Sequence, residues 1–216
     1  MKRKVISRKT VVPLLYIYGV FVVVFIFWLA YRYLTHFSDI IDELLAKPFI
    51  WIVPILFVWF AHSKHNFLSL FSINNLTWGK ILLGVGGGIV LVALQIIPLM
   101  ANGNAKFHIP PGLLSLTLAT VGTAITEEVL FRGFIFKQFQ NYYSSITNFI
   151  ITSLLFAVIH VPILLFINGY SGNSLLVPLY ILFINSLLFC WLYYYTKNLW
   201  VAILAHFIID VLLLIY

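Results

Sequence analysis

The chain has 216 residues, of which 62% are hydrophobic and 9% are charged, and its formal net charge is +7. Soluble domains average about 45–50% apolar and about 25% charged residues, so this composition excludes an ordinary soluble domain. Apolar residues run continuously instead of alternating, which argues against a β-barrel. The composition therefore predicts an all-α, polytopic transmembrane helix bundle, with a single membrane domain over residues 1–216.

Seven apolar segments are long enough to be considered as membrane-spanning helices, which need roughly 20 residues each. They cover 11–34, 48–61, 79–101, 111–131, 146–167, 174–195 and 198–216. The first follows a basic head but is too long for a signal peptide, so we expect it to be retained. The second is short, and either recruits the preceding "IIDELLAK" or is re-entrant. We therefore expect about seven helices, within a range of six to eight.

Two further features of the apolar segments bear on packing and partners. The run "GVGGG" at 84–88 lies inside the third segment, where small residues predict close helix packing. The positive charges separate apolar runs and form no basic stripe with interleaved aromatics, so we expect no nucleic-acid partner. The lipid bilayer is the expected surrounding.

The basic residues predict the orientation of the chain, because cytoplasmic loops are enriched in Lys and Arg. If the N-terminus is cytoplasmic, ten basic residues fall inside and three fall outside. The inside set is Lys2, Arg3, Lys4, Arg8, Lys9, Lys64, Lys80, Arg132, Lys137 and Lys197, and the outside set is Arg32, Lys47 and Lys106. This bias predicts a multi-pass protein of the cell membrane with a cytoplasmic N-terminus.

The six acidic residues divide into two groups. Asp39, Asp42 and Glu43 share one short segment, which we interpret as a hydrated loop. The other three acids, Glu127, Glu128 and Asp210, lie inside apolar segments. An ionisable group within a membrane is costly, so each of these three suggests a functional site.

The first motif is "EEVLFRG", near the predicted cytoplasmic end of segment 111–131. Glu128 and Arg132 are four residues apart, so they share a helix face and can pair. Glu127 points about 100° away and is left free to act on another group. The alternative for Glu128 and Arg132 is a buried ion pair that only locks helices together.

Two further motifs place histidines on the later segments. "FAVIH" puts Phe156 and His160 on one helix face, and Pro162 loosens the helix beside His160. "HFIID" puts His206 and Asp210 on one face of the last segment, where an Asp can orient a His. Each motif alone could be a hydrogen-bonded pair that satisfies itself in lipid.

Taken together, the three motifs predict one interior site, because intramembrane polar groups face the bundle interior. A glutamate and two histidines can activate water and stabilise an oxyanion. The same set suits zinc, with His160, His206 and Glu127 as candidate ligands. The spacing does not decide between these routes. The chain lacks HExxH, and Arg132 adds positive charge, so we expect no obligatory metal.

In this order on successive segments, "EEVLFRG", "FAVIH" and "HFIID" resemble the CPBP family. This is the family of CAAX-processing and bacteriocin-processing intramembrane proteases, also called Abi. The resemblance covers the motif-bearing core at about 111–216. It implies an intramembrane endopeptidase in which Glu127 is the general base and His160 orients the water. It further implies that His206 and Asp210 support the oxyanion, and that Glu128 and Arg132 are structural.

The last motif has Asp210 where CAAX-type members have Asn. This residue is either protonated, or orients His206, or helps to bind a metal. The resemblance suggests a bacterial-type member that acts on a membrane-associated peptide or protein, in bacteriocin maturation or self-immunity. The alternatives are a non-catalytic membrane scaffold or immunity protein with the family fold, and a proton-coupled transporter. The transporter has less support, because the sequence shows no inverted repeat.

Overall fold

The computed structural model describes residues 12–35, 37–62, 76–101 and 108–215, and all regular structure in these ranges is helical. The helices are α1 (Leu14–Leu34), α2 (Asp39–Ile41), η2 (Asp42–Ala46), α3 (Lys47–His62), α4 (Trp78–Ala101), α5 (Leu113–Glu128), η4 (Val129–Phe136), α6 (Lys137–Phe139), α7 (Ser145–Ile159), α8 (Val161–Phe166), η5 (Gly172–Leu175), α9 (Leu176–Thr196) and α10 (Leu199–Leu214). The elements η2 and η4 are π-helical and η5 is a 3₁₀ turn.

Several of these elements join end to end into six apolar runs long enough to cross a membrane. The runs are Leu14–Leu34, Asp42–His62, Trp78–Pro98, Leu113–Phe139, Ser145–Phe166 and Gly172–Thr196, and α10 is a seventh, shorter apolar helix. The all-α fold and the predicted helices are confirmed, and the chain is a multi-pass membrane protein. The short second segment does recruit the residues before it, since its helical run begins at Asp42.

One predicted boundary is wrong. We expected the fourth segment to end at residue 131, but the helix continues through η4 and α6 to Phe139. Every residue of η4 is buried, so packing against neighbouring helices extends this run beyond its most apolar part. Glu127 consequently lies near the middle of a 27-residue run, and not near its end.

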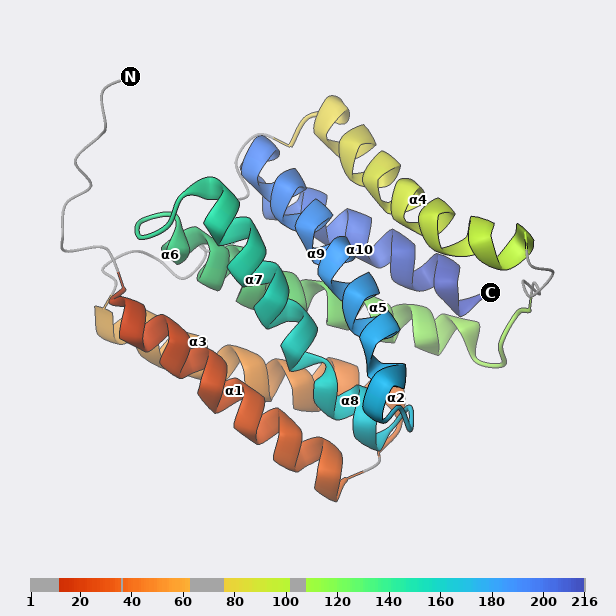
Figure 1. Cartoon of the computed structure of the whole chain (residues 1–216), viewed down its shortest axis with the longest axis horizontal. Helices are drawn as coiled ribbons and strands as arrows, with labels where there is room; N and C mark the ends of the chain where they lie inside the picture. The colour runs from red at the N-terminus through yellow and green to blue at the C-terminus, as the bar shows by residue number, and fades with distance from the viewer. Residues whose placement is uncertain (1–11, 36, 63–75, 102–107, 216) are drawn as a thin grey trace.

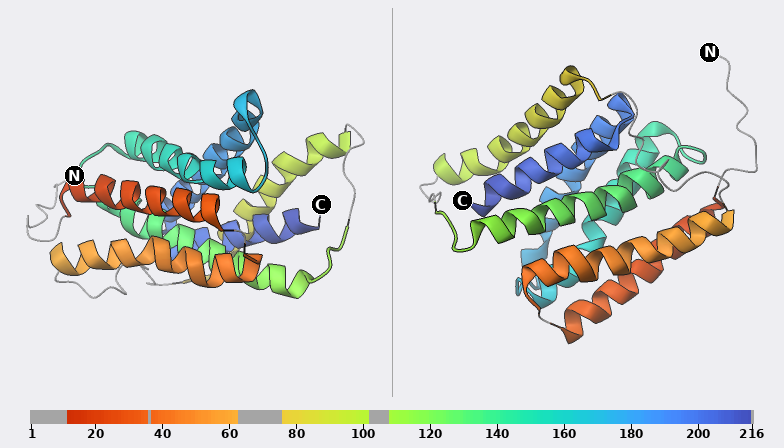
Figure 2. Two further views of the ribbon diagram at one scale, coloured as in Figure 1. Left: turned by 90° about the horizontal axis from the view of Figure 1, so that it is seen from below. Right: turned by 180° about the vertical axis from the view of Figure 1, so that it is seen from behind.

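The helices form two layers. Seen from behind, α4, α10, α5 and α3 lie side by side in that order (Figure 2, right), and α1, α7 and α9 cover the opposite face (Figure 1). Successive long helices run in alternating directions (Figure 1). The carboxy-terminal helix α10 lies between α4 and α5 and also contacts α9 of the other layer.

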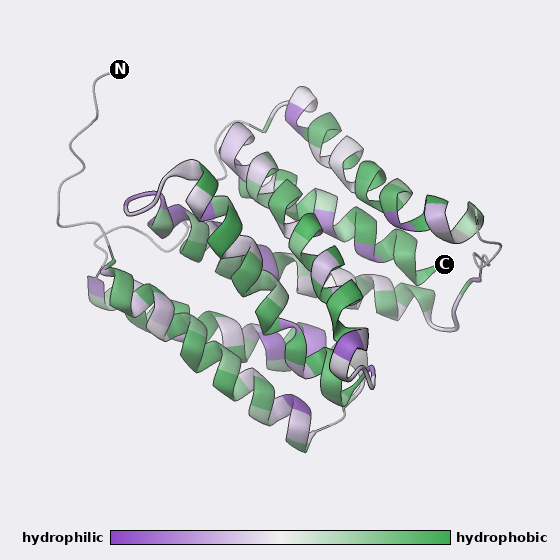
Figure 3. Cartoon of the chain, in the orientation of Figure 1, coloured by the Kyte–Doolittle hydropathy of each residue, from purple (hydrophilic) through white to green (hydrophobic). Residues whose placement is uncertain are grey.

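The outer surface of the bundle is apolar, as expected for helices in contact with lipid. Large hydrophobic side chains are exposed along most helices, for example Phe57 at 79% and Leu114 at 76%. Figure 3 shows helices that are mostly hydrophobic, with hydrophilic segments inside the bundle where η2 and α3 begin. The distribution is the reverse of that in a soluble protein, because the bilayer and not water surrounds the helices.

The glycines of α4 bring this helix close to α10. A Cβ on Gly84 would lie 2.8 Å from the carbonyl oxygen of Val201, and one on Gly88 would lie 2.8 Å from that of Ala205. These contacts agree with the packing role predicted for "GVGGG". They also fix the position of the α10 turn that carries His206.

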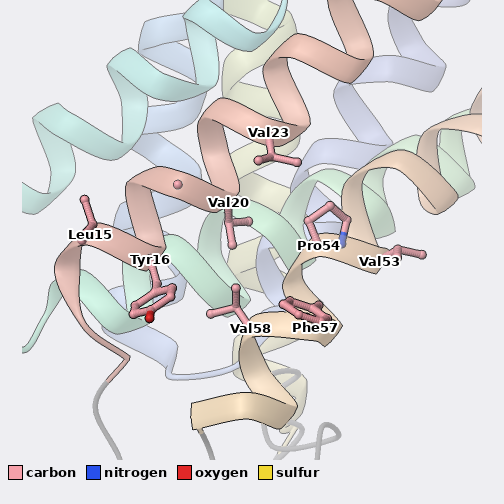
Figure 4. Close-up of a pocket in the computed structure, with 9 residues that line it drawn as sticks. Leu15, Tyr16, Val20, Val23, Val53, Pro54, Phe57 and Val58 are labelled. Atoms are coloured by element: carbon pink, nitrogen blue, oxygen red, sulfur yellow. The ribbon is translucent and has the colours of Figure 1, made fainter.

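An apolar groove of about 580 Å³ lies between α1 and α3 on the outer surface (Figure 4). It is lined by Leu15, Tyr16, Gly19, Val20, Val23, Val53, Pro54, Phe57 and Val58. None of these is an Asp, Glu, Lys, Arg or His. The groove therefore offers an apolar surface that is not suited to acid–base catalysis.

Candidate active site

Five acidic residues have carboxylates that are paired with basic side chains in the bundle interior. They are Asp42, Glu43, Glu127, Glu128 and Asp210. The interpretation of residues 39–43 as a hydrated loop is wrong for two of them, because Asp42 is 2% exposed and Glu43 is bonded on both oxygens. Burial of these carboxylates is tolerated because each meets a basic side chain.

Glu128 and Arg132 form the ion pair that their spacing predicts. Nη1 of Arg132 lies 2.9 Å from Oε1 of Glu128, and both residues are fully buried. Nη2 of Arg132 donates to the hydroxyl of Ser186 at 2.7 Å and to its carbonyl at 3.0 Å. The guanidinium thus ties η4 to α9, and its Cζ lies over the Phe156 ring, 4.8 Å from the ring centroid.

Glu127 is paired as well, which corrects the expectation that it is left free. Its Oε1 lies 2.6 Å from Nζ of Lys47, the first residue of α3. Lys47 had been assigned to an outside loop, but it is 4% exposed and lies within the bundle. The other oxygen of Glu127, Oε2, is buried and makes no hydrogen bond to any described residue.

Lys47 belongs to a chain of ion pairs that crosses from α3 to α1. Its Nζ also contacts Oε2 of Glu43 at 2.6 Å, and Oε1 of Glu43 lies 3.0 Å from Nη2 of Arg32. Nη1 of Arg32 pairs with Asp42. Arg32 had also been counted as an outside loop charge, but it is 3% exposed and sits inside the bundle.

His160 lies at a break between α7 and α8, as Pro162 predicts. Its backbone N–H bonds to Ala157 and not to Phe156, which leaves the Phe156 carbonyl free. Nδ1 of His160 lies 2.7 Å from that carbonyl oxygen. A carbonyl only accepts, so Nδ1 carries the proton. Nε2 is therefore turned toward Oε2 of Glu127, 3.4 Å away.

His206 is held on both sides of its ring. Nδ1 lies 2.9 Å from Oε1 of Glu128, and the ring stacks on Phe189 with centroids 4.7 Å apart. Nε2 lies 3.5 Å from Oδ2 of Asp210 and 3.8 Å from Oε2 of Glu127. Glu128, and not only Asp210, therefore orients this imidazole.

The residues predicted to carry the chemistry meet at one cavity of about 200 Å³ between the two layers. Its lining is Thr123, Glu127, Phe156, His160, Leu182, Asn185, Phe189, His206, Ile209 and Asp210. Glu128 and Arg132 lie outside this lining and contact it through His206 and Phe156. The juxtaposition of Glu127, His160, His206 and Asp210 matches the prediction from the three motifs.

Three of these groups had been considered as zinc ligands. Among the described residues, no group of three or more His, Cys, Asp or Glu side chains has an arrangement that could hold a metal ion. Each of the candidate ligands His160, His206 and Glu127 already has a partner, namely the Phe156 carbonyl, Glu128 and Lys47.

Sequence reasoning missed the residues that come from the amino-terminal half and from α9. Lys47 and Glu43 are four apart in a helical run, and this spacing could have signalled an ion pair inside the second segment. Asn185 gave no signal of its own. It lines the cavity, and its Oδ1 accepts a hydrogen bond from Gln95 of α4 at 3.2 Å.

A family model matches the part of the chain that carries the three motifs. The model of Rce1-like type II CAAX prenyl endopeptidases matches residues 109–212, just under half of the chain. This stretch contains all three motifs. Residues 109–212 therefore resemble this family of membrane proteases, which confirms the recognition made from the motifs. Searches among curated proteins and among solved structures gave no match.

Proposed function

We propose that the protein is an intramembrane endopeptidase that hydrolyses a peptide bond with a water molecule activated by Glu127. The observation that carries this proposal is the geometry of two acceptors. Oε2 of Glu127 makes no hydrogen bond to a described residue, and Nε2 of His160 lies 3.4 Å from it at the same cavity. Glu127 lies on α5 and His160 at the junction of α7 and α8, so helices position both groups.

The two acceptors define how a water molecule binds. With Nδ1 of His160 protonated, a neutral ring accepts at Nε2, so one water can donate to both Nε2 and Oε2 of Glu127. A lone pair on the water oxygen then faces the substrate carbonyl carbon. As the C–O bond forms, Glu127 takes one water proton, and it returns this proton to the amide nitrogen as the C–N bond breaks.

His206 is the proposed donor to the oxyanion. Its Nδ1–H is directed to Glu128, and a ring protonated at both nitrogens donates from Nε2 into the cavity. Asp210 lies 3.5 Å from the same nitrogen and orients the ring. This role for Asp210 differs from that of the amide in CAAX-type members, because a carboxylate cannot donate.

We propose that no metal is obligatory. Two cations already lie near the cavity, Lys47 paired with Glu127 and Arg132 paired with Glu128, and they would repel a dication bound there. The alternative is zinc on His160, His206 and Glu127, with water at the open position. Chelation with re-addition of zinc, together with elemental analysis of the same sample, decides between the two routes.

The proposed substrate is a membrane-associated peptide or protein, because the cavity opens within apolar helices. Processing of a bacteriocin-type peptide, or self-immunity, is the proposed physiological setting. A panel of internally quenched peptides separates substrate classes: a farnesylated CAAX peptide, the same peptide without the prenyl group, and an apolar transmembrane peptide.

We propose that the N-terminus is cytoplasmic and the protein resides in the cell membrane. Arg32, Lys47 and Arg132 are buried in the bundle, so they no longer count as loop charges. Nine basic residues then remain on the predicted cytoplasmic side, and only Lys106 remains on the other side. The structure does not describe residues 2–9, 64 and 106 of this set. Protease access to terminal tags in sealed cells measures this orientation, and an externally accessible N-terminal tag would contradict it.

The deciding experiment is proteolysis by the purified, full-length protein in detergent. The wild type and Glu127→Gln are compared on the peptide panel. We expect cleavage by the wild type only. His160→Ala is compared with His62→Ala as a matched control. His62 bonds to the backbone carbonyl of Val58 at the end of α3, away from the cavity. Full cleavage by Glu127→Gln would refute the assignment.

A further inference from the structure

We infer that Lys47 is a positioning residue for Glu127, and that α3 therefore supplies part of the active site. The inference rests on the proposed function of Glu127. Lys47 lies outside residues 109–212, the part of the chain that matches the protease family. Its ammonium fixes one oxygen of Glu127, and this leaves the other oxygen directed to His160.

The contacts of Glu127 divide its two oxygens between two tasks. Oε1 lies 2.6 Å from Nζ of Lys47, whereas Oε2 lies 3.4 Å from His160 and 3.8 Å from His206. A carboxylate rotates about its last side-chain bond unless one oxygen is held. The short ion pair to Lys47 holds it, so the free oxygen stays at the cavity.

Lys47 is itself fixed by its surroundings. Its Nζ bonds to Glu43 and lies 5.1 Å from the Trp51 ring centroid and 5.8 Å from that of Trp28. Glu43 in turn accepts from Thr123 of α5 at 2.7 Å and from Arg32 of α1 at 3.0 Å. The ammonium therefore cannot leave Glu127 without breaking contacts to three helical elements.

Gly122 allows the segment that carries Glu43 and Lys47 to lie close to α5. A Cβ on Gly122 would lie 2.9 Å from the carbonyl oxygen of Glu43 and 2.5 Å from Cδ2 of Leu44. The backbone of η2 therefore rests directly on α5 one residue before Thr123. The close approach carries Glu43 and Lys47 to Glu127.

Kinetics with the best-cleaved panel peptide tests the positioning role. We expect Lys47→Met to lower kcat by about 10²-fold, the effect of a misplacement of roughly 1 Å, with KM changed less than about threefold. Lys47→Arg keeps the charge and should recover part of kcat. Lys80→Met, the same substitution in the first turn of α4, should leave kcat unchanged. Retention of full kcat by Lys47→Met would overturn the inference.

A double-mutant cycle in thermal stability tests the pair without any substrate. Removing one partner of a buried pair strands the other, so we expect Lys47→Met to lower Tm by roughly 6 °C or more. Lys47→Met in a Glu127→Gln background should lower Tm clearly less than it does in the wild type. Additive Tm shifts would show that the two residues do not interact and would overturn the inference. If the wild type cleaves no peptide, the proposed function fails, and the cycle still reports on the pair.

Discussion

Glu127 and Glu128 are neighbours in the sequence, but the structure surrounds them differently. Glu128 is bonded within its own half of the chain, to Arg132 one turn away and to His206 of α10. Glu127 is bonded across the chain to Lys47, and one of its oxygens borders the cavity. Adjacent carboxylates in one buried site therefore differ in their partners: one holds helices together and the other faces the cavity.

The comparison also shows how the two halves of the chain depend on each other. The carboxy-terminal half contains every motif residue, yet the ammonium on Glu127 comes from α3 and is supported by Arg32 of α1. The amino-terminal helices consequently supply a direct partner of a cavity-lining residue. Variants of the two carboxylates and their partners can separate these roles.

The largest effect is expected at Glu127. Glu127→Gln removes the proposed base but keeps the side-chain shape, so kcat should fall by about 10²–10⁴-fold. The protein should remain folded, because Lys47 keeps its bond to Glu43. Initial rates on the panel peptide and a thermal melt of the same preparation measure both properties. If Glu127→Gln is unfolded under conditions in which the wild type is folded, the lost rate would follow from unfolding, and this would contradict the separation of roles.

Arg132→Ala should act on stability. The substitution strands the fully buried Glu128 and removes two hydrogen bonds to Ser186. Breaking such a pair typically destabilises by about 3–5 kcal/mol. Unfolding in detergent measures the change, and Lys80→Ala serves as a control for loss of a positive charge. Adding Glu128→Gln to Arg132→Ala should restore part of the stability, and no restoration would argue against the pair.

His206→Ala should lower kcat by about 10²–10³-fold, since it removes the proposed oxyanion donor. His206 also contacts Glu128, so the variant is compared with His206→Gln, which restores a donor but not a charge. A change confined to KM would assign His206 to substrate binding instead. His62→Ala should have no effect on kcat, because His62 does not line the cavity.

The sequence allowed the helices and most of the site to be predicted, and the reasons are local. Long apolar runs define helices, and residues four apart share a face, which gave Glu128 with Arg132 and His206 with Asp210. The contact between Lys47 and Glu127 joins residues 80 positions apart, and no periodicity reports it. The prediction of a loop in segment 39–47 is wrong, although its charged residues are typical of a loop. These residues pair with one another and with Arg32 inside the bundle, so the helical run can include them.

The smallest effect is expected at Asp210, and it bears on whether a metal is needed. With a side chain 28% exposed and 3.5 Å from His206, Asp210 contributes less to the buried pairing than Glu127 or Glu128. In the route without a metal, Asp210→Asn keeps kcat within about tenfold, because the amide can donate to the oxyanion. In the zinc route, loss of a carboxylate that ligates or orients a ligand should lower metal affinity about 10–100-fold. Activity and metal content of the wild type and Asp210→Asn, before and after chelation, distinguish the two. Stoichiometric zinc whose removal abolishes activity and whose return restores it would overturn the route through Glu127 and water alone.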